Sequence, residues 1–96
     1  METVYIVHLA VSRKTAHSDE KINRTNGVYA SYESAKAAML AAVREVVRDY
    51  HMDIPAGQIV ASECSVSGVC ECSICEHTDK YFTAVLSYVY TATVQP

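Results

Sequence analysis

A helical period of apolar positions runs through residues 31–50 and dominates the pattern of this chain. The apolar side chains recur three or four positions apart, at Ala35, Met39, Ala42, Val43, Val46, Val47 and Tyr50. This is the spacing of one face of an α-helix. Ser31 stands where a helix N-cap belongs, and Pro55 disfavours helical backbone just before it. The pattern predicts a long amphipathic helix that needs a surface to cover.

Apolar runs on either side of this helix are typical of β-strands. We expect strands at residues 3–12, 58–66, 69–75 and 81–94, and a short extended piece at residues 27–30. The polar stretch 13–26 has no period and is expected to form a long loop. The elements follow in the order β-β-α-β-β-β. We therefore expect a single α+β domain over residues 1–96, with one long amphipathic helix packed on a mostly antiparallel sheet of about four strands.

The expected sheet has more apolar surface than one helix can cover. The strand at 3–12 is largely apolar on both sides. In the strand at 81–94, one row is bulky and is expected beneath the helix: Phe82, Ala84, Leu86, Tyr88, Tyr90 and Ala92. The other row, Thr- and Val-rich, suits a contact between subunits. The uncovered face needs another partner, and the sequence therefore predicts a homo-oligomer.

Composition and charge narrow the function classes. The chain has 96 residues and a net charge of −3, which argues against broad nucleic-acid binding because that requires a basic face. No uncharged stretch approaches the roughly 20 residues of a membrane span. Glu2 stands where a signal peptide would carry basic residues. We expect a cytoplasmic protein whose four cysteines are reduced thiols or metal ligands.

The densest group of reactive side chains lies between the helix and the last strand. It consists of Cys64, Cys70, Cys72, Cys75 and His77. Cys72 and Cys75 have the CxxC spacing of zinc knuckles, with Cys70 and His77 near enough in sequence to complete four ligands. On a regular strand, however, Cys75 points away from Cys70 and Cys72. The alternatives are a small zinc- or thiol-dependent module, a redox pair, or buried structural thiols.

Half of the basic residues fall within twelve positions of the expected loop, at Arg13, Lys14, Lys21 and Arg24. With Tyr81, Tyr88 and Tyr90 from the last strand, they form the candidate binding surface, since tyrosine suits interfaces. A small anionic ligand held between subunits by Arg13, Lys14 or Arg24 is a further possibility. The simpler alternative is a solvated loop, because Asp19 and Glu20 neutralise much of the charge.

Catalytic motifs are missing from the sequence. It contains no HExxH, no GxSxG and no phosphate-cradling glycine loop, and its four histidines are scattered along the chain. We therefore expect a non-catalytic protein without a required cofactor.

The first half of the chain contains a recognisable sequence motif. The segment GVYASYESAKAA at 27–38 follows the pattern G-x-Y-x-S-x-E-x-A, with a VY-rich strand at 4–7 and an acidic loop at 18–20 before it. In this it resembles many small uncharacterised bacterial and phage proteins, and its size and style are similar to phage accessory proteins, including anti-CRISPR and other anti-defence inhibitors. The resemblance implies a protein that binds and blocks or sequesters a host protein or protein complex in the host cytoplasm. It implies no particular functional residue.

Overall fold

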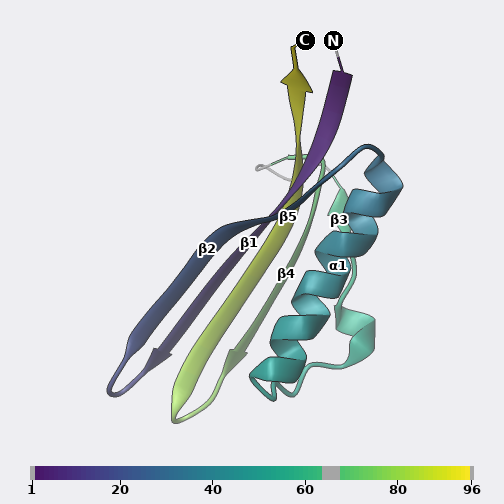
Figure 1. The fold of residues 1–96 in the computed structure, drawn as a ribbon. Helices are drawn as coiled ribbons and strands as arrows, with labels where there is room; N and C mark the ends of the chain where they lie inside the picture. Colours follow the sequence, from purple (N-terminus) through teal and green to yellow (C-terminus); the bar gives the residue numbers. More distant parts are fainter. Residues whose placement is uncertain (1, 64–67, 96) are drawn as a thin grey trace.

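A computed structural model describes residues 2–63 and 68–95, and these residues form one helix packed on an antiparallel sheet (Figure 1). The elements are β1 (Glu2–Thr15), β2 (Asp19–Tyr29), α1 (Tyr32–Asp49), the 3-10 turn η1 (Ala56–Gln58), β3 (Ser62–Glu63), β4 (Cys70–His77) and β5 (Tyr81–Val94). Within the described residues the sheet has five strands in the order β2-β1-β5-β4-β3. The α+β class and the helix-on-sheet arrangement are confirmed, but the sheet has one strand more than expected.

The extra strand replaces the expected loop at 13–26. β1 continues to Thr15, and the chain turns back through residues 16–18 into β2, which pairs with β1 from Lys14↔Asp19 to Tyr5↔Tyr29. The loop prediction is wrong because β2 is an edge strand and most of its residues are exposed. Such a strand needs no alternation of apolar and polar residues, and charged side chains protect its free edge from further pairing.

A β-bulge bends β2 toward the start of the helix. One residue of β1 stands opposite two of β2 between the pairs Ile6↔Val28 and His8↔Thr25. Gly27 in this bulge has a φ of 135°, a backbone conformation that residues with a Cβ rarely adopt. The bulge thus explains why a glycine stands inside a strand.

The helix begins and ends where the sequence predicts. The Oγ of Ser31 accepts a hydrogen bond from the N–H of Ser34 at 3.2 Å, which satisfies one of the free donors of the first turn. Asp49 is the last helical residue, and the C-cap Tyr50 donates its N–H to the carbonyl of Val46 at 2.9 Å. Ala35, Met39, Ala42 and Val43 are buried against the sheet.

The core lies between α1 and one face of the sheet, which we call the covered face. It receives Val7, Leu9 and Val11 from β1, Cys70, Cys72 and Ile74 from β4, and Thr83, Val85, Ser87 and Val89 from β5. The expectation that the bulky row of β5 lies beneath the helix is therefore wrong. The smaller, branched row lies there instead, because it is in register with the apolar row of β1 through the pairs Val7↔Val89, Leu9↔Ser87 and Val11↔Val85.

The segment between the helix and β4 is largely irregular. The expected strand at 58–66 is reduced to Ser62–Glu63, and Ile59 before it is buried in the core. Residues 64–67, which include Cys64, lie outside the described residues. β5 pairs with β1 along its whole length, from Glu2↔Val94 to Thr15↔Tyr81. Among the described residues, no helix is long and apolar enough to cross a membrane.

Candidate functional site

The face of the sheet opposite α1 is the candidate site, and we call it the open face. No other element of the described residues packs on it, and the helix lies on the other side (Figure 1). Strand register places alternate residues here. The central rows, written from β1 to β5, are Ile6–Tyr90, His8–Tyr88, Ala10–Leu86, Ser12–Ala84 and Lys14–Phe82. Glu71, Ser73, Cys75 and His77 of β4 and Thr25, Asn23 and Lys21 of β2 extend these rows on either side.

Three half-buried aromatic rings adjoin one another on the open face, those of His8, Tyr88 and Tyr90, and we call this group the aromatic ridge. The ring centroids of His8 and Tyr88 are 5.2 Å apart, and those of Tyr88 and Tyr90 are 6.0 Å apart. The Nε2 of His8 donates a hydrogen bond to the Oδ1 of Asn23, which fixes the imidazole against β2. These mutual contacts hold the three rings in place.

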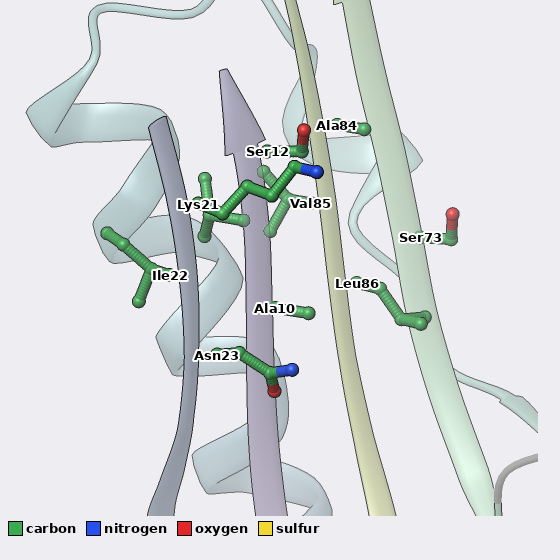
Figure 2. A pocket seen from close by; sticks show the side chains of 10 residues that line it. Ala10, Ser12, Lys21, Ile22, Asn23, Ser73, Ala84, Val85 and Leu86 are labelled. Carbon is green, nitrogen blue, oxygen red and sulfur yellow. The ribbon is translucent and has the colours of Figure 1, made fainter. Parts of the chain in front are cut away.

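A shallow hollow of about 290 Å³, shown in Figure 2, lies two residues along the strands from the His8–Tyr88 row of the ridge. Its floor consists of the small side chains of Ala10, Ser12 and Ala84, Leu86 stands beside it, and the Lys21 side chain reaches from β2 across β1 toward Ser12. The hollow exists because three small residues meet across β1 and β5 while larger side chains flank them. Ridge and hollow therefore lie next to each other along the same two strands.

The charged groups of the open face are few and come mostly from its outer strands, although the Lys21 side chain reaches from β2 into the hollow. Lys14, Asp19 and Lys21 lie near the β1–β2 turn, and Glu71 lies on β4. The centre, from Ile6–Tyr90 to Ser12–Ala84, carries alkyl, phenol, imidazole and hydroxyl groups. An apolar centre with a polar rim is the usual anatomy of a protein–protein interface.

The expected basic residues do not converge on one site. Lys14 and Lys21 are exposed on the open face, whereas Arg13 and Arg24 have the register of the covered face. The guanidinium carbon of Arg13 lies 4.9 Å from the ring centroid of Tyr50 and 4.4 Å from that of Tyr81, and its Nη1 donates to the Oγ1 of Thr83 at 3.3 Å. Arg13 thus fastens the end of the helix to the sheet.

Tyr81 also belongs to this internal cluster rather than to the open face. Its hydroxyl donates to Oε1 of Glu76 at 2.5 Å, and the N–H of Asp53 donates to Oε2 at 2.7 Å. The hydrogen bond from Tyr81, then the one from Asp53, and the nearby charge of Arg13 lower the pKa of the Glu76 carboxyl. The bond to Glu76 raises the pKa of Tyr81. The cluster ties the segment after the helix to β4 and β5.

The four candidate zinc ligands are divided between the two faces of β4. Cys70 and Cys72 are buried on the covered face, where the thiol of Cys70 donates to the sulfur of Met39 at 3.7 Å and burial raises the pKa of Cys72. Cys75 and His77 are exposed on the open face. Over residues 2–63 and 68–95, no three Cys, His, Asp or Glu side chains are grouped to hold a metal ion. These four residues therefore do not form one coordination site in this fold.

Of the expected binding residues, Lys14, Lys21, Tyr88 and Tyr90 lie together on the open face. The sequence pattern did not indicate that His8, Leu86 and the hollow belong to the same surface. The alternation of small residues at Ala10, Ser12 and Ala84 was the available signal, but their meeting depends on the β1–β5 register. Comparisons with protein-family models, with curated proteins and with solved structures found no match for this chain.

Proposed function

We propose that this chain is a non-catalytic interaction protein that binds another protein through its open sheet face. In the setting that the sequence resemblance implies, the partner includes a host protein whose action is blocked by the binding. Self-association through the same face is the simplest form of this function, because a second copy brings a surface of the same chemistry.

One observation carries the proposal: large apolar and aromatic side chains stand on the side of the sheet away from the helix. Phe82 remains 40% exposed and Val28 59% exposed, and both have the register of the open face. Leu86, Tyr88 and Tyr90 are half-buried beside them. A continuous apolar strip with a polar rim marks an interaction site more often than a solvated surface.

The chemistry of the face favours binding over catalysis. His8, the titratable ring at its centre, is engaged by Asn23 and stacked beside Tyr88. The alkyl and phenol groups around it provide contact area and hydrogen bonds, which are the means by which protein interfaces bind.

The test compares Leu86→Lys on the open face with Val60→Lys. Val60 is also apolar and is 57% exposed, but it lies in the segment before β3. Affinity capture from the natural host, with cross-linking through Lys14 and Lys21, identifies the bound proteins. We expect partners, including other copies of this chain, to be captured by the wild type and by Val60→Lys and lost with Leu86→Lys. Equal capture by all three proteins would contradict the proposal.

A further inference from the structure

We infer that a second copy of this chain occupies the open face, in a two-fold dimer in which His8 and Tyr88 of the aromatic ridge of each copy fill the hollow of the other. The inference rests on the proposed function and names the occupant of the same surface. Its basis is the relative position of ridge and hollow, together with the size and charge distribution of the face.

Ridge and hollow are placed symmetrically about one row of residues. The row Ala10–Leu86 lies between the row His8–Tyr88 of the ridge and the row Ser12–Ala84 at the floor of the hollow, two residues along the strand in each direction. We place a two-fold axis midway between two stacked sheets, perpendicular to the strands and directly over Leu86. Rotation about this axis places the His8–Tyr88 row of one copy over the Ser12–Ala84 row of the other. Tyr88 of one copy then lies over Ala84 of the other, and the Leu86 side chains meet at the axis.

The same operation matches the outer rows. It places the Tyr90 ring of one copy over Phe82 of the other, so that the exposed Phe82 ring gains an aromatic neighbour. In the rows nearest the axis, the large side chains of the His8–Tyr88 row thus face the small ones of the Ser12–Ala84 row. Stacked sheets interdigitate in this way at a separation of about 10 Å. An isologous contact needs this kind of self-complementary surface.

The face is large enough for a stable dimer. Four strands about 4.8 Å apart and nine residues long cover roughly 550 to 600 Å² in projection. Side-chain relief brings the accessible area toward the roughly 800 Å² that each partner buries in a standard interface. Lys14, Asp19 and Glu71 lie toward the margin of this area and stay in water when its centre is covered. The long Lys21 side chain, which reaches the hollow, has to swing back over the β2 edge to keep its ammonium group in water.

The sheet edges are less suited to a second copy. The free edge of β2 carries Asp19, Glu20, Lys21 and Arg24, and charged side chains on an edge strand oppose strand addition. On the other side, β3 contributes the two exposed residues Ser62–Glu63, and farther along β4 the segment after the helix is in contact, where the N–H of Asp53 donates to Oε2 of Glu76. The open face is therefore the surface on which we place the second copy.

The experiment exchanges the large and small residues that the dimer brings together. Tyr88→Ala removes the ring from the ridge, and Ala84→Phe fills the hollow. Each single variant should raise the dimer dissociation constant by about tenfold or more. The double variant Ala84→Phe/Tyr88→Ala restores a large residue opposite a small one and should recover most of the wild-type affinity. Within one chain, positions 84 and 88 are about 13 Å apart along the strand, so direct contact between them does not produce the rescue.

Sedimentation equilibrium and light scattering measure the association of the 10.6 kDa chain over a concentration series, with Val60→Lys as the control that leaves it unchanged. A far-ultraviolet circular dichroism spectrum checks that each variant is folded, and rescue in the double variant provides a second check. A wild type that stays monomeric throughout overturns the inference, and so does a dimer that is indifferent to Ala84→Phe and Tyr88→Ala. A monomer that still captures a host protein through Leu86 overturns the dimer and leaves the proposed function standing.

Discussion

The two faces of this sheet are built from neighbouring residues of the same strands, yet they have opposite characters. On β5 the covered face receives Thr83, Val85, Ser87 and Val89, which are at most 1% exposed. The open face receives the larger Phe82, Leu86, Tyr88 and Tyr90, none of which is fully buried. Small and branched side chains let the helix approach closely, and close packing determines which residues form the core. Hydrophobicity alone would have chosen the other row.

The largest expected difference between the faces is in thiol reactivity. In a Cys64→Ser background, Cys75 on the open face should react with a disulfide reagent more than about a hundred times faster than Cys70 and Cys72, which require the covered face to open. The measurement is the time course of thiol modification in dilute protein, assigned by mass spectrometry. Three equal rates would show that the helix does not protect the covered face. Slower modification of Cys75 at high protein concentration would agree with a second copy on the open face.

Truncating a leucine on each face compares the two surfaces in stability. Leu9 is 2% exposed beneath the helix, and Leu9→Ala should lower the free energy of unfolding by about 2 to 5 kcal/mol because it leaves a cavity. Leu86→Ala on the open face removes the same atoms from a half-buried position and should cost less than about 1 kcal/mol in the monomer. Urea denaturation below the dimerisation concentration measures both. Equal losses would mean that the open face is packed within the monomer.

Two serines provide a smaller and opposite effect. The hydroxyl of Ser87 is buried on the covered face and has no hydrogen-bond partner among the described residues. Ser87→Ala removes this unsatisfied group and should raise the free energy of unfolding by about 1 kcal/mol. Ser73→Ala, on the exposed side of β4, should leave it unchanged within about 0.5 kcal/mol. Destabilisation by Ser87→Ala would indicate a partner for this hydroxyl.

The smallest expected effect is a pH dependence that belongs to the covered side. The pKa of Glu76 is lowered in the folded protein, so its contribution to stability is present above the unfolded pKa of about 4.3 and is lost as the pH falls through the lower folded value. Glu76→Gln should therefore be less stable than the wild type at neutral pH, and the difference should shrink in acid. Thermal unfolding from pH 7 to pH 3 measures this. Glu71→Gln, on the open face, is the control, and a difference that grows in acid would contradict the assignment.

The sequence by itself determined the helix α1 and the last strand, β5. The apolar period over 31–50, the cap at Ser31 and the alternation over 81–94 are local properties, and the helix of 18 residues and the strand Tyr81–Val94 follow from them. The sequence also showed that β1 is apolar on both sides, because this property depends only on the residues of β1 and not on the strands that pair with it. The cover of its open side by a second copy remains a prediction.

The tertiary structure decided which side of each strand became the core and where the candidate site lies. Both rows of β5 are apolar enough to be buried, and the choice came from pairing with Val7, Leu9 and Val11 across fourteen residue pairs. β2 could not be recognised locally, because an edge strand gains its hydrogen bonds from β1 rather than from its own pattern. The hollow likewise appears when Ala84 meets Ala10 and Ser12, from which about seventy positions separate it in the chain. Long-range register, which no local pattern encodes, set these features.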